Sequence, residues 1–259
     1  MRSLRIWLHY AKNAFLQTLT NRIFFLLFLF GKCARVLLFL VFLYFLLQST
    51  NGLGGYSKEQ IIFFYLSFNL VDSASQFLFR EVYRFRELVV RGDMDLVLVK
   101  PINPLLRVML GGTDALDLLM LLIIGGAVIY TGITGISMNS GNWIIYGLLL
   151  LNALIISAAF HMLILAIGVL TTSIDHLTMV FRDTMAMLRI PVDVYSEPLR
   201  GILTFVVPLG IMMTFPPKAL MGLLSWPLIL ISFCISLIAV TLAHWFWKRS
   251  LREYQSASS

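Results

Sequence analysis

The sequence has little charge for its size. Charged residues make up 13% of its 259 positions and hydrophobic residues 59%, whereas soluble globular domains contain about 25% charged residues. This composition excludes an ordinary water-soluble domain, which needs a larger share of polar side chains at its surface. We therefore expect the chain to reside in a lipid bilayer.

Several chemical signatures are also absent. The only two cysteines, Cys33 and Cys234, lie in apolar runs, where a thiol behaves as a small hydrophobic group. No N-x-[ST] glycosylation acceptor occurs. The phosphate-binding motif G-x-x-x-x-G-K-[ST] is missing, because Leu26 stands where the Gly31–Lys32 pair would require an earlier glycine. The sequence thus excludes a disulfide scaffold and ATP hydrolysis, and we expect neither enzyme activity nor a cofactor or metal on this chain.

Long apolar runs dominate what is present. Only helices and closed barrels satisfy every backbone polar group in hydrocarbon, and these runs are continuous instead of alternating. We predict an all-α integral membrane protein with one transmembrane domain over residues 1–259. The runs that meet the requirement of about 20 helical residues are 59–79, 108–130, 143–170 and 226–247. The run 23–47 also qualifies except for Lys32 and Arg35 in its middle.

The first twenty residues have a different pattern. Residues 1–20 carry apolar side chains such as Trp7 and Phe15 at helical spacing, with Arg2 and Arg5 at other positions. An amphipathic helix of this kind lies in the membrane interface. We find no short apolar core followed by a cleavage site, so no removable signal peptide is predicted.

The region 173–222 allows two arrangements. In the first, 173–190 is the fifth of six spans and 191–217 is a re-entrant or broken extracellular segment. In the second, 173–190 is an interfacial helix and 199–215 is a kinked span. We favour the first, because the apolar stretch around Pro208 is short for a span and a broken segment is tolerated where protein or water covers it.

Basic residues indicate the orientation. Lys and Arg concentrate before the first span, between the second and third, and after the last, while the intervening loops hold few. Cytoplasmic loops are the ones enriched in Lys and Arg, so both termini are expected in the cytoplasm. The formal net charge of +7 is explained by this sidedness, and no nucleic-acid partner is expected.

A polar insertion, RGDMDLVLVKPINP, follows the second span at residues 91–104. The preceding residues 80–91 have a helical pattern, so we expect the second span to continue beyond the bilayer until Gly92, which suits a left-handed helix end. Asn103 and Pro104 are typical of a helix cap and first turn, which would start the third span.

The same insertion contains an apolar stretch. Asp93 opens a short element, Leu96 to Val99 give it an apolar body and Pro101 ends it. Four apolar side chains are costly to leave in water, so we expect a partner surface to cover them.

Lys32 and Arg35 are three residues apart and therefore share a helix face. We favour snorkelling of both side chains to the cytoplasmic interface. Pairing with a buried carboxylate such as Asp72 or Asp114 and contact with a substrate are the alternatives.

Two further charges, Asp114 and Asp117, lie near the inner end of the third span and share a face. Ion pairs with Arg107, Lys32 or Arg35 are favoured over a proton relay. A structural role is the expectation, because intramembrane charges commonly pair with one another.

The second span carries a polar stripe at i, i+3, i+4 and i+7. Its members are Asn69, Asp72, Ser73 and Gln76. Polar groups at this depth face the bundle or a cavity, so interhelical hydrogen bonding and pathway lining both remain open. An intramembrane enzyme would need acids and histidines to converge, whereas His161 stands alone on its span.

The order GGYS, charged extension, RGDMDLVLVKPINPL and the late RIPVDVYSEPLRGILTFVVPLGIMMTFPP resembles the permease subunits of type-2 ATP-binding-cassette (ABC-2) exporters. The resemblance is to the bacterial group of similar length, and it covers most of the chain. It implies a bacterial cytoplasmic (inner) membrane, a pair of permease copies as a homodimer or paralogous heterodimer, and a separate ATPase that binds ATP and Mg²⁺. Lys32 and Arg35 depart from the pattern that we associate with this family.

The resemblance further implies that residues 80–104 form a cytoplasmic coupling segment whose helix docks on the ATPase. Its candidate coupling residues are Glu81, Arg84, Arg86, Arg91, Gly92, Asp93, Leu96, Leu98, Lys100 and Pro101. The expected function is a permease subunit that forms a translocation pathway. The alternative is a non-transporting membrane scaffold or assembly factor that docks a cytoplasmic partner, and the sequence leaves the substrate open.

Overall fold

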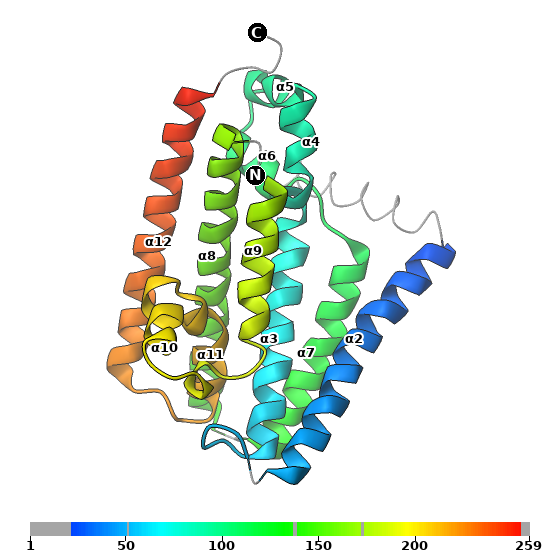
Figure 1. Ribbon diagram of the computed structural model, residues 1–259, viewed down its shortest axis with the longest axis vertical. Coiled ribbons are helices and arrows are strands. Elements are labelled where there is room, and N and C mark those ends of the chain that lie inside the picture. The colour runs from blue at the N-terminus through cyan, green and yellow to red at the C-terminus, as the bar shows by residue number, and fades with distance from the viewer. Residues whose placement is uncertain (1–21, 51, 137–138, 172–173, 255–259) are drawn as a thin grey trace.

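The computed structural model describes residues 22–50, 52–136, 139–171 and 174–254, and the expected interfacial helix at 1–20 lies outside them. Within these ranges the chain is helical, and its one β feature is an isolated bridge between Leu53 and Tyr56 (Figure 1). The long helices are α2 (Arg22–Ser49), α3 (Lys58–Phe79), α7 (Ala115–Gly135), α8 (Ser140–Thr171) and α12 (Trp226–Glu253). The shorter elements are η1 (Arg80–Arg84), α4 (Phe85–Val90), α5 (Asp93–Val99), α6 (Pro104–Leu110), α9 (Ile174–Met187), η2 (Val192–Val194), α10 (Leu199–Gly201), η3 (Ile202–Val206) and α11 (Leu209–Leu220).

Five of these helical segments are long and apolar enough to cross a membrane, or six if the bent pair Leu199–Val206 and Leu209–Leu220 counts as one span. This confirms the predicted all-α membrane fold. The second segment runs from Lys58 to Val90, so the prediction that the second span continues beyond residue 79 is also confirmed.

The bundle is arranged around α8, which packs against α12, α11 and α3, while α3 also packs against α7. Helix α2 contacts α3 and α7 and diverges from the rest toward one end (Figure 1). We call that end of the bundle, which carries α4, α5 and α6, the α5 end. The opposite end carries residues 52–57 between α2 and α3, and we call it the loop end.

The predicted third span is wrong at its start. It was expected over 108–130, but α6 ends at Leu110 and α7 begins only at Ala115. Asn103 does cap a helix as predicted, because its side chain accepts from the Leu105 backbone N–H, yet that helix is the separate α6. Asp114 caps α7 in the same way, because its side chain accepts from the Leu116 backbone N–H. Each cap satisfies a backbone donor that has no helical partner.

The segment 191–220, predicted to be re-entrant, begins and ends near the loop end. Near its start, Asp193 accepts a hydrogen bond from Tyr56 at 2.7 Å, and near its finish Lys218 Nζ lies 3.0 Å from the Asp193 Oδ2. Burial and this hydrogen bond raise the pKa of the Tyr56 hydroxyl, so it remains the donor. Between these anchors the chain bends by 90° between η3 and α11. By length and composition this bent pair fits either a broken span or a re-entrant loop, so it is compatible with both predicted arrangements.

Helix α9 connects the two ends of the bundle. Its first residue, Ile174, packs on Gly168 of α8, and soon after its last turn the Val192 N–H donates to Thr214 in the re-entrant segment. With 14 residues, α9 is about 21 Å long, which is shorter than the span predicted over 173–190. Its buried residues are Ile174, Thr178, Phe181 and Met185.

Candidate functional site

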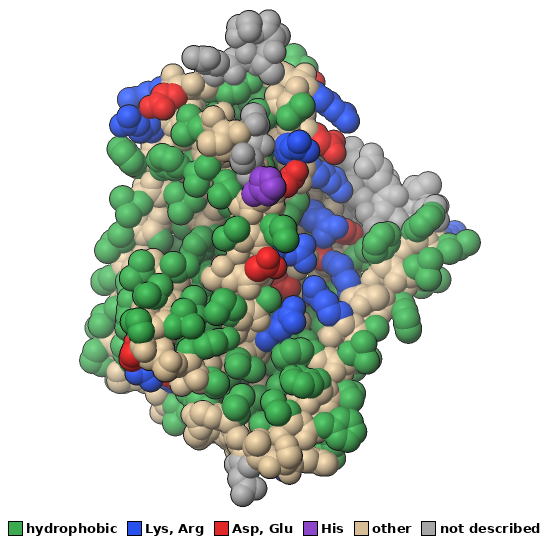
Figure 2. Space-filling view, in the orientation of Figure 1, with side chains coloured by type: hydrophobic (Ala, Val, Ile, Leu, Met, Phe, Trp, Pro, Cys, Tyr) green, Lys and Arg blue, Asp and Glu red, His purple; other side chains and the backbone are tan. Residues whose placement is uncertain are grey.

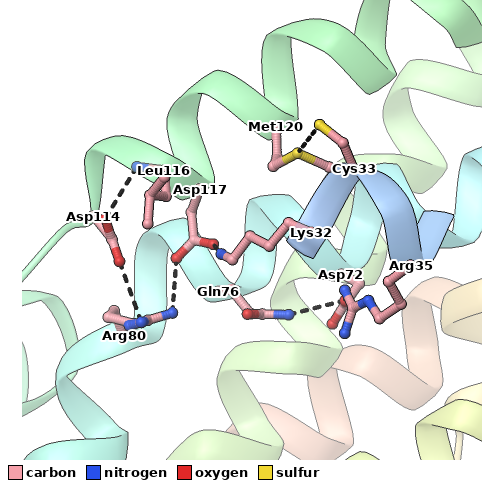
Figure 3. Close-up of polar contacts among 10 residues, drawn as sticks. All are labelled: Lys32, Cys33, Arg35, Asp72, Gln76, Arg80, Asp114, Leu116, Asp117 and Met120. Carbon is pink, nitrogen blue, oxygen red and sulfur yellow. Dashed lines mark hydrogen bonds and ion pairs between the residues drawn. The ribbon is translucent and has the colours of Figure 1, made fainter. Parts of the chain in front are cut away.

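Four charged side chains meet near the α5 end of the bundle (Figure 3). Lys32 on α2 and Arg80 at the start of η1 both bind Asp117 on α7, and the Arg80 Nη1 lies 3.1 Å from the Asp117 Oδ2. The Arg80 Nη2 also lies 3.2 Å from the Asp114 Oδ2. The Asp117 side chain is only 2% exposed, so its charge depends on these partners. We call Lys32, Arg80, Asp114 and Asp117 the charged layer.

Snorkelling, the favoured prediction for Lys32 and Arg35, is wrong for Lys32. Its ammonium group turns inward to Asp117, because α7 begins beside it and offers a carboxylate within reach. Arg35 remains half-exposed, with its Nη2 3.8 Å from the Asp72 Oδ2. The alternative of a buried carboxylate partner is therefore the one that the structure supports, and the Lys32–Asp117 pair is one of the ion pairs predicted for Asp117.

A second ion pair fixes η1 to α6. Arg107 Nη1 donates to the Glu81 Oε1 at 2.7 Å, and the Glu81 side chain is 9% exposed. The pair packs on Gly111 and Gly112, where a Cβ atom would approach the Arg107 and Glu81 side chains within 2.5 Å. Arg107 was expected beside Asp114 or Asp117, and the structure pairs it with Glu81. Glu81, predicted to contact the ATPase, is instead buried within the chain.

Helix α5 has one covered side and one exposed side. Gly92 precedes it with φ +74°, the left-handed conformation that glycine adopts without strain. Met94 and Val97 are buried, whereas Leu96 is 62% exposed and Val99 is 85% exposed. Residues three apart share a helix face, so Leu96 and Val99 form an apolar strip on the outer side.

The expectation that a partner covers all of Leu96 to Val99 therefore needs correction. Val97 packs into the core of this chain, and Leu98 is half-buried against it. The remaining coupling candidates lie at the surface of α4, α5 and their flanks, where Gly92 is half-buried and the exposed residues are Arg84, Arg86, Arg91, Asp93, Lys100 and Pro101. Arg86 Nη1 lies 3.3 Å from Asp175 Oδ2 on α9, and Arg91 lies 3.8 Å from Glu87. Exposed pairs of this kind contribute little stability.

Two members of the polar stripe of α3, Asn69 and Asp72, line a pocket. Gln76, one turn after Asp72, donates to the Asp72 Oδ2 at 2.9 Å. Asn69 also donates to the backbone oxygen of Tyr65 one turn earlier in the same helix. Ser73 is buried.

The pocket holds about 350 Å³ and lies between α2, α3 and α9. Its charged side chains are Arg35, Asp72, Arg182 and Arg189. Sequence reasoning did not single out Arg182 on α9 and Arg189, two residues beyond the end of that helix, as site residues. It also missed Arg80, whose position one residue beyond α3 gave no sign that the side chain turns back to α7.

The comparisons with known proteins agree with this architecture. A family model described as ABC-2 family transporter protein matches residues 34–258, which include α5 and all of the charged layer except Lys32. No curated protein and no solved structure matches the chain. Since the family model covers most of the sequence, the chain belongs to the ABC-2 transporter family, which supplies the membrane permease components of ABC transporters.

Proposed function

We propose that this chain is the membrane-spanning subunit of an ATP-driven exporter and that α5 docks on a separate ATPase subunit. The observation that carries this proposal is the division of α5 into two sides. Met94 and Val97 hold the helix on the bundle, while Leu96 and Val99 present an apolar strip outward. Exposed apolar strips beside charged residues are typical of protein contacts.

The path from α5 into the bundle is short and mechanically continuous. Helix α4 follows η1 and α3 without a break, and Glu81 ties η1 to α6 through Arg107. Arg80, one residue before Glu81, ties the same segment to α7. A displacement of α5 would therefore reach α3, α6 and α7 together, as a rigid-body movement requires.

The remaining parts of the proposal concern partners and orientation. ATP and Mg²⁺ bind the ATPase, because this sequence has no phosphate-binding motif. Two permease copies, identical or paralogous, bracket one pathway in a bacterial cytoplasmic membrane, with both termini and the α5 end in the cytoplasm. The distribution of Lys and Arg supports this orientation, and it places the re-entrant segment on the outside.

The test is co-purification of the permease with a P-loop ATPase encoded in an adjacent reading frame. The double variant Leu96→Asp, Val99→Asp introduces two charges into the proposed contact and should weaken association at least about 30-fold, as loss of a central contact does. The matched control is Leu106→Asp on α6, an exposed leucine outside the coupling segment. Normal association of the double variant would refute docking through α5.

Transport itself is tested by reconstitution of the complex. An exporter requires ATPase activity that rises in the presence of a transported compound and falls in the α5 double variant. A scaffold that only docks a partner would bind the ATPase through the same helix but would leave its turnover unchanged across a panel of compounds.

A further inference from the structure

The pocket between α2, α3 and α9 has an excess of positive charge. Three arginines line it, Arg35 from α2, Arg182 from α9 and Arg189 from the turn after α9, and the one carboxylate in its lining is Asp72. Three cations and one anion leave two positive charges. Figure 2 shows Lys and Arg side chains gathered over the region between α9 and α2 on this face of the molecule.

The arginines of this pocket are poorly neutralised by the protein. Asp72 lies 3.8 Å from Arg35 and also accepts a hydrogen bond from Gln76. Neither Arg182 nor Arg189 forms an ion pair in the part of the chain that the structure describes. The Arg189 guanidinium carbon instead lies 5.4 Å from the centre of the Phe39 ring. Charges at membrane depth are normally paired or hydrated, so these guanidinium groups are open to an anion that enters the pocket.

Part of the pocket wall is apolar and aromatic. Phe39, Tyr65 and Phe68 line it beside the arginines, and Leu38 and Phe42 extend the lining onto the outer side of α2, where they are 70% and 55% exposed. An anion that enters here therefore has its charged group among guanidinium groups and any attached chain against hydrocarbon surface. Guanidinium groups suit phosphate and carboxylate because they donate paired hydrogen bonds to two oxygens.

We propose that this pocket binds an anionic amphiphile. Its phosphate or carboxylate group lies among Arg35, Arg182 and Arg189, and its apolar chain lies along Leu38 and Phe42. Asp72 competes with the ligand for Arg35 and limits the affinity. The inference concerns binding by the permease chain alone, so it does not rest on the proposed coupling to an ATPase.

The experiment measures lipid binding to the full chain in detergent by native mass spectrometry. The probes are phosphatidic acid, phosphatidylcholine and inorganic phosphate, and each is titrated separately. Phosphatidic acid should bind more tightly than the other two, because only it combines an exposed anionic group with apolar chains. Loss of one charged hydrogen-bond donor, in Arg35→Gln or Arg189→Gln, should weaken its binding about tenfold. Arg252→Gln, an exposed arginine at the end of α12, is the control and should bind like the parent chain.

A gain of affinity separates this proposal from a structural role of the arginines. Asp72→Asn removes the competing carboxylate and should strengthen phosphatidic acid binding, an effect that damage to the fold would not produce. The proposal is overturned if the double variant Arg35→Gln, Arg189→Gln binds phosphatidic acid like the parent. It is also overturned if inorganic phosphate or phosphatidylcholine binds as tightly as phosphatidic acid. If the double variant Arg35→Gln, Arg189→Gln loses self-association and still binds phosphatidic acid, the anion at these arginines is a carboxylate of a second copy of the chain. That result would refute the proposed amphiphile.

Discussion

Arg80 and Asp117 join the far end of the second span to the first turn of α7, with the Arg80 Nη1 3.1 Å from the Asp117 Oδ2. Asp117 also receives Lys32 from α2. One carboxylate thus holds three spans together at the level where α3 passes into the segment that leads to α5.

The first prediction concerns the Lys32–Asp117 pair. Asp117→Asn should destabilise the protein by about 2 kcal/mol, because the partly buried Lys32 loses its charged hydrogen-bond partner. Thermal unfolding in detergent provides the measurement. The double variant Lys32→Met, Asp117→Asn removes the cation as well and should recover part of the loss. Additive effects of Lys32→Met and Asp117→Asn would contradict the pairing.

The second prediction concerns the link between η1 and α6. Glu81→Gln breaks the charge pair with Arg107 and should raise amide hydrogen exchange over residues 93–110 about tenfold, since a charged hydrogen bond contributes about 1.5 kcal/mol. Glu87→Gln is the control, because Glu87 forms only an exposed pair with Arg91. Unchanged exchange in Glu81→Gln would show that the pair does not hold α6 in place.

The third prediction uses two glycines. Gly112→Ala should destabilise the protein, because the added Cβ would lie 2.5 Å from the Glu81 Oε2. Gly126→Ala on α7 has no neighbour within 4 Å of the added Cβ, and alanine favours a helix over glycine by up to about 1 kcal/mol. Unfolding temperatures should therefore move in opposite directions. A similar effect of both substitutions would exclude the close contact of Gly112 with Glu81.

The fourth prediction concerns the re-entrant segment. Asp193→Ala removes the acceptor of both Tyr56 and Lys218, so residues 192–220 should become more accessible to hydrogen exchange and to protease. Asp183→Ala on α9 is the control, because Asp183 is exposed and has no ion pair within the described residues. Equal protection of residues 192–220 in both variants would argue against the anchor.

Local features of this fold could be predicted from the sequence. Gly92 ends a helix in the left-handed conformation and Asn103 caps the next one, because glycine and asparagine act through their own backbone and nearest neighbours. The five membrane-length helices were visible from their length and apolarity alone, apart from the start of the third. Each of these signals extends over a few turns of chain, which is the range at which a sequence pattern is informative.

Contacts between distant segments could not be predicted in the same way. Lys32 and Asp117 are 85 residues apart in sequence, and several carboxylates were equally acceptable partners until the packing of α2 and α7 was known. The break before α7 also depends on a distant group, since the Glu81–Arg107 pair occupies the space beside Gly111 and Gly112. The cationic pocket requires α2, α3 and α9 to be placed together, so neither its volume nor its charge excess appears in any one stretch of sequence.

The most direct test of the account is site-specific cross-linking of α5 to the ATPase. In a background with Cys33 and Cys234 replaced by alanine, single cysteines are introduced at Leu96 and Val99 on the exposed side and at Met94 and Val97 on the buried side. Docking through the exposed strip predicts cross-links to the ATPase from positions 96 and 99 and none from positions 94 and 97. Cross-links from the buried positions, or none from any of the four in an assembled complex, would contradict the claim that α5 is the coupling helix.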